Sequence, residues 1–441
     1  MKDEATHQAG GYIELLRDNS DFRRLWTGLL VSQTGDWFNT VALFTLLLNL
    51  TGSGESVGYI LIIKLLPAFF AGPLAGVVAD RFNRKIIMVT ADLLRAVIVL
   101  GFLFIDSPEQ VWMVYAITAL QVMATTFFDP AMSAMVPSIV ARRHLIAANA
   151  LSSVSWSITL AFGAAVGGLF TNWFGREAAF IIDSATFFVS AAFVYSVRVP
   201  ARKHTLERRK QKLSIVEATG IADIIEGAKY LKSNKRVMAL LLVKSGWGMG
   251  GGVLLLLTIF GKQIFPIGRD GSASIGLLYA ARGFGALIGP MIARAITGVS
   301  VRTMRQAIAV AFVVSTIFYL LFAWSPSIWA ASIFVIGAHA GGSIQWVFST
   351  VLLQMTVPDK FLGRVFALEL ALLTLTMSIS TYLTGWGIDY GELSPRQMAA
   401  ILGFAFLVPG ILWFIAQRRM GHGDEITRLD DDKSMEAAPA D

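Results

Sequence analysis

Long apolar stretches recur along the whole sequence, and they constrain the fold more than any other feature. Apolar residues make up 55% of the 441 residues and charged residues only 15%, whereas about a quarter of an ordinary soluble domain is charged. An apolar stretch of about 20 residues can cross a bilayer as an α-helix. The sequence therefore predicts an all-α membrane protein, and it excludes a soluble enzyme, a disordered chain and a fibrous repeat protein.

Twelve stretches are long and apolar enough to be transmembrane helices, six in each half of the chain. They are expected at residues 24–50, 57–79, 86–105, 111–135, 149–172, 177–197, 237–260, 273–296, 304–323, 328–356, 365–389 and 397–417. Asp129-Pro130 interrupts the fourth stretch and a group of glycines interrupts the fifth. The limits of these two helices are the least defined.

Basic residues fall mainly in alternate connections between the stretches. Only Arg176, Lys262, Arg269 and Arg396 lie in the connections on the other side. Because cytoplasmic loops carry the excess of Lys and Arg, we expect a multi-pass protein of the inner (plasma) membrane with both termini cytoplasmic. The net charge of +7 then reflects contact with anionic membrane lipids, and no nucleic-acid partner is expected.

The connection in the middle of the chain is the longest and divides it in two. Its second part, which includes Ile221, Ile225 and Leu231, has apolar residues at helical spacing and predicts an amphipathic helix on the cytoplasmic leaflet. The predicted segments are a six-helix bundle at 1–197, a cytoplasmic linker with this helix at 198–236, a second six-helix bundle at 237–417, and a cytoplasmic tail at 418–441.

The two halves contain similar residues in the same order. Val136-Pro137 before Arg143 recurs as Val357-Pro358 before Arg364, a shift of 221 residues. The same shift relates Arg81 and Arg84 to Arg302 and Arg305, and Lys64 matches Arg282 at a shift of 218. Several ordered matches indicate two parallel repeats of six helices, an arrangement that encloses a substrate cavity at the interface of the repeats in major facilitator transporters.

Three motifs then resemble a known family. The sequence Gly-Val-Val-Ala-Asp-Arg-Phe-Asn-Arg-Lys from Gly76 to Lys85 resembles the signature loop of the major facilitator superfamily. The sequences Ser32-Gln-Thr-Gly-Asp-Trp37 and Leu362-Gly-Arg-Val365 resemble its macrolide-efflux and enterobactin-exporter branch. The resemblance implies two pseudo-symmetric six-helix bundles and a transporter that needs no cofactor and works as a monomer.

The resemblance also implies a cytoplasmic gate in the loop after the second stretch. In the family this loop latches the two halves together, which favours the outward-facing state. The residues expected at this gate are Gly76, Asp80, Arg81, Arg84, Lys85 and Arg364. Asp80 could cap the next helix. The alternative is that the basic residues only fix the orientation of the chain in the membrane.

Acidic residues within the stretches are candidates for proton coupling, because burying a charge in the membrane is unfavourable. Asp36 lies near the middle of the first stretch, where protonation would remove its buried charge. A structural hydrogen bond is the alternative. Glu369 is the second candidate, but it could instead pair with Arg364 at helical spacing. Asp92 and Arg95 are expected to pair within one helix, and for Asp129 and Asp183 a role in helix packing is equally plausible.

Polar and basic residues at other positions could line the substrate cavity. These are Gln33, Asn39, Lys64, Arg282, Gln345, Trp346 and Tyr382. Lys64 and Arg282 occupy equivalent places in the two repeats and could attract an anionic part of a substrate. They could equally extend to the outer headgroups, and Lys244 is expected to extend to the cytoplasmic face.

Small residues in the fifth stretch predict close helix packing. Gly163, Gly167 and Gly168 lie at spacings that let helices approach closely. The segment resembles the antiporter motif of the superfamily, with Ala164 in place of the expected proline. A plain packing surface is the alternative to a role in antiport.

Several other classes of site are not supported. The glycines from Gly246 to Gly251 match a dinucleotide-binding pattern, but they lie in an apolar stretch without a preceding strand. No phosphate-binding Gly-Lys-Ser/Thr sequence is present, which excludes an ATP-driven pump within this chain. There is no cysteine and the five histidines are scattered, so no metal site is predicted. His339, the histidine within a stretch, is expected to pack as a polar residue.

Together these features predict a secondary transporter rather than an enzyme. Its partners would be an amphipathic small molecule such as a drug, macrolide or siderophore, together with protons and membrane lipids. Export by proton antiport with alternating access is the first hypothesis. A lysophospholipid or other lipid transporter of the same fold is the alternative, and a non-transporting membrane sensor is the third.

Overall fold

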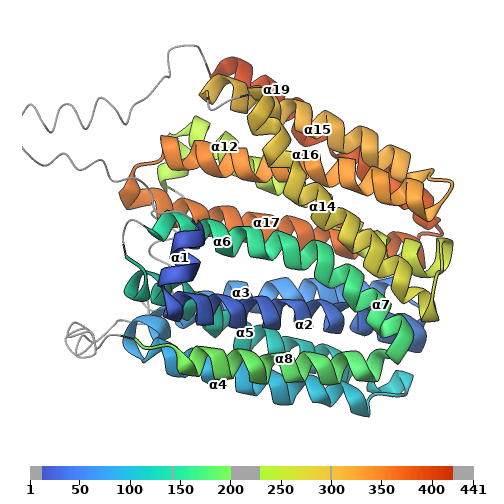
Figure 1. The fold of residues 1–441 in the computed structure, drawn as a ribbon. Coiled ribbons are helices and arrows are strands. Elements are labelled where there is room, and N and C mark those ends of the chain that lie inside the picture. The colour runs from blue at the N-terminus through green and yellow to red at the C-terminus, as the bar shows by residue number, and fades with distance from the viewer. Residues whose placement is uncertain (1–11, 142–143, 200–228, 298–299, 421–441) are drawn as a thin grey trace, which may run out of the picture. The chain divides into compact units, whose positions relative to one another are not determined.

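The computed structural model describes residues 12–141, 144–199, 229–297 and 300–420, and over these ranges it contains helices and no strands (Figure 1). The all-α prediction is therefore confirmed. Within the described residues, nine helical stretches are long and apolar enough to cross a membrane. They coincide with the predicted third, fourth, sixth and seventh to twelfth stretches. The count of twelve stays a prediction.

The described residues from 12 to 199 form eight α-helices. They are α1 (Tyr12–Asp18), α2 (Ser20–Thr51), α3 (Gly54–Arg81), α4 (Arg84–Val99), α5 (Val111–Ile139), α6 (Leu145–Ile158), α7 (Ala164–Phe174) and α8 (Arg176–Ser196). Short 3₁₀ turns, η1 (Leu100–Phe104) and η2 (Pro108–Gln110), connect α4 to α5, and a π-helical turn, η4 (Thr159–Gly163), joins α6 to α7. The predicted first, second and fifth stretches fall on α2, α3 and α6 to α7.

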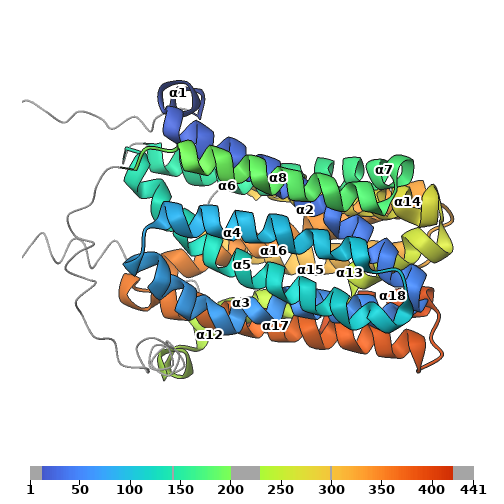
Figure 2. The ribbon, with the colours of Figure 1, turned by 90° about the horizontal axis from the view of Figure 1, so that it is seen from below.

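The described residues from 235 to 420 also form eight α-helices. They are α12 (Lys235–Gly248), α13 (Val253–Ile259), α14 (Ser272–Thr297), α15 (Val301–Ala323), α16 (Ile328–Thr356), α17 (Asp359–Asp389), α18 (Pro395–Ala405) and α19 (Leu407–Arg419). The π-helical turn η5 (Phe260–Ile264) and the 3₁₀ turn η6 (Arg269–Gly271) connect α13 to α14. Figure 2 shows the same helices from below.

Polar side chains mark where several helices begin. Asn19 accepts a hydrogen bond from Phe22 N at the start of α2, and Ser53 accepts one from Ser56 N at the start of α3. Asn83, and not Asp80 as expected, does the same for the first turn of α4. These side chains satisfy N–H groups that have no partner within the helix. Gly52, with φ of 65°, ends α2 in the left-handed conformation that glycine favours.

The seventh predicted stretch is divided in two, which corrects the expectation of one continuous helix at 237–260. Residues Met249 to Gly252 form a turn between α12 and α13. Glycines in this turn pack tightly, since a Cβ at Gly250 would overlap the Phe406 ring and one at Gly251 would lie 2.8 Å from the Met377 backbone. In contrast, α5 continues through Pro130 and Pro137.

The chain divides into two compact units. Unit 1 comprises Met1–Thr219 and Thr258–Ala280, and unit 2 comprises Gly220–Leu257 and Ala281–Asp441. In unit 1, α2 packs against α7 and α8, α3 packs against α5, and α4 packs against α5 and α8. In unit 2, α12 packs against α16 and α17, and α15 packs against α16, α18 and α19.

The two units differ in extent from the predicted bundles. Thr258–Ala280 covers the end of the seventh stretch and the start of the eighth. This segment belongs to the unit that contains the first half of the chain. The predicted limits at 197, 236 and 417 stay predictions. Ile221 and Ile225 of the predicted amphipathic helix, and residues 421–441 of the predicted tail, lie outside the described residues, whereas Leu231 is buried.

Candidate functional site

A polar cavity of about 420 Å³ lies within unit 1. Its walls come from α2, α3, α4 and α5, and ten of its eleven lining residues are polar or charged. The lining residues are Asp36, Asn39, Thr40, Lys64, Arg95, Thr118, Gln121, Val122, Thr125, Thr126 and Asp129. Three predicted site residues, Asp36, Asn39 and Lys64, therefore come together at one cavity.

Helical spacing brings these side chains to the cavity. Asn39 and Thr40 lie three and four residues after Asp36 along α2, which places all three on one face. On α5, the lining residues from Thr118 to Asp129 recur at the same intervals. These polar faces interrupt two otherwise apolar helices, and sequence analysis had not recognised the one on α5.

Asp36 is half-buried in the cavity wall. Among the described residues, none makes a hydrogen bond or ion pair with its carboxylate. The charges of Arg95 and Lys64 act on it from α4 and α3. Thr40 Oγ1 donates to the main-chain oxygen of Asp36 at 2.7 Å, and Lys64 Nζ donates to Thr40 Oγ1 at 2.9 Å. Asp36 is thus a cavity-lining acid whose carboxylate is not held by another side chain of the described chain.

Arg95 is held firmly from several sides. It pairs with Asp92 one turn earlier on α4, which confirms the predicted intrahelical pair. Ser190 Oγ of α8 donates to Asp92 Oδ2 at 2.7 Å. The guanidinium also lies 4.8 Å from the ring centroid of Phe128 and 4.4 Å from that of Phe187, distances typical of cation–π contact. Arg95 therefore has its charge largely satisfied by Asp92.

Glu369, the predicted coupling acid of unit 2, forms a buried ion pair. Lys244 Nζ of α12 lies 2.7 Å from Glu369 Oε2 of α17, and both side chains are buried. Lys244 also lies 4.7 Å from the Trp346 ring centroid. Pairing of Glu369 with Arg364 and extension of Lys244 to the cytoplasmic face were both wrong, because the two residues face each other across packed helices.

The other predicted cavity residues lie elsewhere. Gln33 of α2 accepts a hydrogen bond from Thr159 Oγ1 of η4 at 3.2 Å. In unit 2, Gln345 is fully buried, and neither of its amide atoms has a partner within the described chain. Trp346 and Tyr382 are about two-fifths exposed. Arg282 acts electrostatically on Tyr319 and His339, which contact each other in the interior of unit 2.

Two predicted gate residues bind helix ends within unit 1. Arg84 Nη1 donates to Ala134 O of α5 at 2.6 Å. Lys85 Nζ donates to Val197 O after α8 at 3.0 Å. Arg364 lies 5.8 Å from the Phe361 ring centroid in unit 2. The side chains of Asp80 and Arg81, and the surroundings of Gly76, lie outside the described part of the structure.

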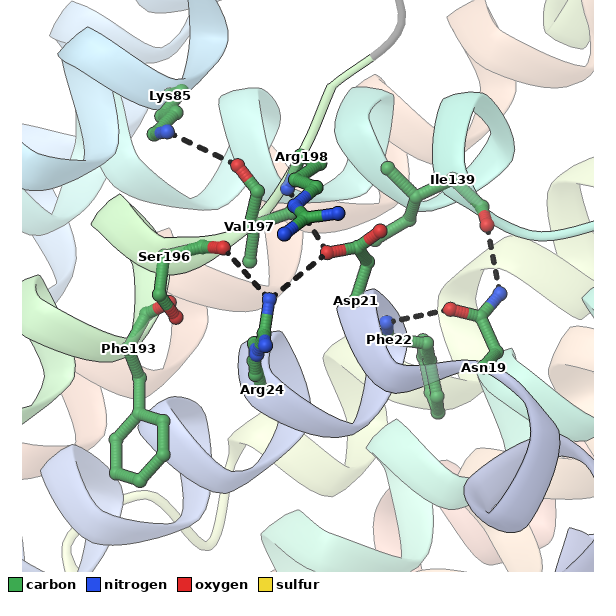
Figure 3. A network of polar contacts seen from close by, with 10 residues as sticks. All are labelled: Asn19, Asp21, Phe22, Arg24, Lys85, Ile139, Phe193, Ser196, Val197 and Arg198. Atoms are coloured by element: carbon green, nitrogen blue, oxygen red, sulfur yellow. Dashed lines mark hydrogen bonds and ion pairs between the residues drawn. The ribbon is translucent and has the colours of Figure 1, made fainter.

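Figure 3 shows how polar contacts join these helix ends to α2. Arg24 Nη1 donates to Ser196 O at 3.0 Å and pairs with Asp21 at 3.5 Å. Asp21 Oδ1 in turn accepts a hydrogen bond from Arg198 N at 2.9 Å. Asn19 Nδ2 donates to Ile139 O at 2.7 Å. The contacts fix the ends of four helices at one end of unit 1, and sequence analysis did not identify this network.

The predicted packing glycines lie at close helix contacts in unit 1. A Cβ at Gly163 would lie 3.0 Å from the Trp37 ring, and one at Gly167 would lie 2.8 Å from the Phe38 ring. A Cβ at Gly168 would lie 2.7 Å from Ser272 O and 2.8 Å from the Cα of Gly276. The glycines therefore let α7 approach both α2 and the first part of α14.

Comparison with known proteins agrees with this architecture. A sequence model of the Major Facilitator Superfamily matches residues 25–380, so the chain belongs to this family of membrane transporters. The chain is 30% identical over 281 residues to an uncharacterized MFS-type transporter, YkuC, of Bacillus subtilis, a match that covers 62% of this chain and 64% of that one. It is 27% identical over 383 residues to macrolide efflux protein A of Streptococcus pyogenes, covering 83% of this chain and 89% of that one.

A solved structure has the same fold. The nucleoside transporter NupG, as a D323A mutant, superimposes with a TM-score of 0.69 at 14% identity, covering 90% of this chain and 99% of that chain. The predicted major facilitator fold is therefore confirmed, and the protein is a multi-pass membrane protein.

Proposed function

We propose that this protein is a secondary active transporter that exports an amphipathic small molecule in exchange for protons. The observation that carries the proposal is the position of Asp36, an acid in the middle of the long helix α2 that lines a polar cavity without a hydrogen-bonding partner among the described residues. Such an acid can gain and lose a proton when access to the cavity changes. Glu369, the other acid predicted for coupling, is paired with Lys244 and would exchange a proton only when that pair opens.

The charges around the cavity favour a particular class of substrate. Asp36 and Asp129 face the cavity, whereas of its two cations Arg95 already pairs with Asp92. The remaining cation, Lys64, is accompanied by both acids. A neutral or cationic amphipathic molecule therefore fits this surface better than an anionic one. The similarity to a protein named for macrolide efflux supports export of such a molecule.

The proposed orientation in the membrane places the gate on the cytoplasmic side. Both termini would be cytoplasmic in the inner membrane, and the end of unit 1 that carries Arg24 and Lys85 would face the anionic inner leaflet. The two six-helix bundles would expose the cavity to either side in turn, with the monomer as the working unit. The loop from Gly76 to Lys85 together with Arg364 would act as the cytoplasmic gate, and Gln33, Arg282, Gln345, Trp346 and Tyr382 would complete the substrate path.

Transport by reconstituted protein tests the proposal. Vesicles of phosphatidylethanolamine and phosphatidylglycerol would contain wild type, Asp36→Asn, or Asp106→Asn, which removes an exposed carboxylate outside the cavity. An imposed proton gradient should drive ethidium or labelled erythromycin across the membrane in wild type and in Asp106→Asn, but not in Asp36→Asn. Wild-type rates in Asp36→Asn would remove Asp36 from the coupling role. Movement of labelled lysophosphatidylcholine in place of both probes would favour a lipid transporter.

A further inference from the structure

A second acid lies behind the cavity wall in unit 1. Asp183 of α8 is 0% exposed, and neither of its carboxylate oxygens has a hydrogen-bond partner within the described chain. It packs against α2 beside Asp36, since a Cβ at Gly35 would lie 2.7 Å from Asp183 Oδ1. A fully buried carboxyl with two unbonded oxygens needs a physical explanation.

The side-chain oxygen of Asn39, close to Asp183, also receives no hydrogen bond within the described structure. Asn39 is a polar neighbour of Asp183, is only 6% exposed, and its Oδ1 is also buried without a partner in the described structure. Its Nδ2 donates to Gln121 Oε1 at 3.4 Å, and both amides line the cavity. The Asn39 amide acts on Asp183 as a hydrogen-bonding neighbour. With one N–H directed to Gln121, it can offer an N–H to only one carboxyl oxygen, and Asn39 Oδ1 itself has no donor in the described structure. A proton on Asp183 would supply that donor.

The charges of the neighbouring helices lead to the same conclusion. Away from the helix ends, the described carboxyls of α2, α4, α5 and α8 are Asp36, Asp92, Asp129 and Asp183, and the described cations of α3 and α4 are Lys64 and Arg95. Asp92 and Arg95 neutralise each other. Three acids then share one cation, Lys64. Of these three acids only Asp183 is fully buried, whereas Asp36 is half-buried and Asp129 is exposed. An unpaired charge is therefore most unfavourable at Asp183, and a proton there removes it.

We propose that Asp183 is a second proton-binding site, which holds one proton while the cavity acids Asp36 and Asp129 share another. This inference rests on the proposed function and extends it to a proton stoichiometry of two. The proton of Asp183 would exchange with the cavity beside Asn39, because Asn39 neighbours the buried acid and itself lines the cavity.

The groups that face Asp183 come from a small set of elements. Asp36 faces it from α2, and Asp92 and Arg95 come from α4. Lys64 of α3 and Asp129 of α5 lie across the cavity. Neither α7 nor η1, which also pack against α8, carries a titratable residue. Release of the proton from Asp183 would therefore be favoured by Lys64 and Arg95 and opposed by an ionised Asp36.

Infrared spectroscopy of the full-length protein tests the assignment without any substrate. Wild type, Asp183→Asn, Asp36→Asn and Asp106→Asn would be reconstituted into phosphatidylethanolamine–phosphatidylglycerol vesicles in potassium buffer. The carboxylic acid C=O absorption would be recorded from mildly acidic to alkaline conditions, in H₂O and in D₂O. A buried protonated aspartate absorbs in this region, whereas an ionised one does not.

We expect wild type to show a carboxylic acid band that is absent from Asp183→Asn, retained in Asp36→Asn and Asp106→Asn, shifted in D₂O and lost on going to alkaline buffer. If Asp183→Asn fails to fold, Asp183→Ser offers a smaller side chain for the same site. A band absent from wild type would overturn the proposal. So would a band that neither D₂O nor alkaline buffer changes, because Asp183 would then be a permanently neutral packing residue.

Sodium provides the last control. If replacing potassium by sodium at constant pH removed the band, the site would bind Na⁺ and the assignment to a proton would be wrong. These spectra are independent of transport. If no carboxylic acid band could be assigned to Asp183 while antiport through Asp36 was intact, this inference alone would be rejected. If the band was present but antiport was absent, the proposed function alone would be rejected.

Discussion

The two units treat their buried charges differently. In unit 1, Asp36 lines a polar cavity without a side-chain partner in the described structure, and Asp183 is buried without one. In unit 2, Glu369 is joined to Lys244 at 2.7 Å. Burial favours the protonated form of all three acids, and only Glu369 has a bonded cation that opposes this effect. The comparison indicates that proton exchange belongs mainly to unit 1 and that the pair in unit 2 mainly joins α12 to α17.

The largest stability effect is expected from breaking the pair in unit 2. Glu369→Gln leaves the Lys244 ammonium buried without its counter-ion, which should lower the free energy of unfolding by about 3–5 kcal/mol. Asp36→Asn should change it by about 0.5 kcal/mol or less, because that carboxylate has no bond to lose. Thermal unfolding of both variants in one detergent measures the difference. Equal losses would contradict the comparison.

Removing both members of the pair should restore stability. In Lys244→Met/Glu369→Leu no buried charge is left unpaired, and apolar residues fill the same space. We expect the double variant to recover to within about 1–2 kcal/mol of wild type, or to exceed it. A double-mutant cycle measures the coupling between the two residues. If the loss in the double variant equalled the sum of the two single losses, the coupling would be zero and the pair would not be a stabilising contact.

A smaller effect is expected where α2 meets Asp183. The added methyl of Gly35→Ala would push against Asp183 and Thr186. Overpacking of this kind should cost about 1–3 kcal/mol. Gly52→Ala does not serve as a control, because that glycine has a positive φ. Val166→Ala, at an exposed position of α7, is a better one and should have little effect on unfolding in detergent. Stability in Gly35→Ala equal to that of Val166→Ala would mean that the contact is loose.

The smallest effect is expected at Lys64. Lys64→Met removes the hydrogen bond to Thr40 Oγ1 and should lower the free energy of unfolding by about 1 kcal/mol. It also removes the one unpaired cation among three acids, so we expect the cavity to bind an additional proton. Potentiometric titration of the purified variant against wild type measures that uptake. Unchanged proton uptake would show that the charges of unit 1 are not coupled.

The sequence alone was sufficient for the fold. Apolar stretches of bilayer length, the ordered matches between the halves and the sequence from Gly76 to Lys85 all predict the architecture that the structure and the family comparison confirm. These features can be recognised in a single sequence because they depend only on composition and on the order of residues along the chain. Neither requires knowing which way a helix faces.

The arrangement of the site could be predicted only in part. Asp36, Asn39 and Lys64 were recognised as unusual polar residues, but the cavity face of α5, including Gln121, was not. The pairing of Lys244 with Glu369, 125 residues later, also escaped prediction. Both depend on the rotation of one helix against another, which packing determines and which a single sequence of nearly uniform apolar helices does not specify.

Proton movement during export tests the central claim most directly. Vesicles of reconstituted protein would contain a pH-sensitive dye, and ethidium would be added without an imposed proton gradient. The account predicts that ethidium uptake drives protons in the opposite direction in wild type and Asp106→Asn, and that Asp36→Asn shows no proton movement. Ethidium transport by wild type without any change in internal pH, or an equal proton flux in Asp36→Asn, would contradict it.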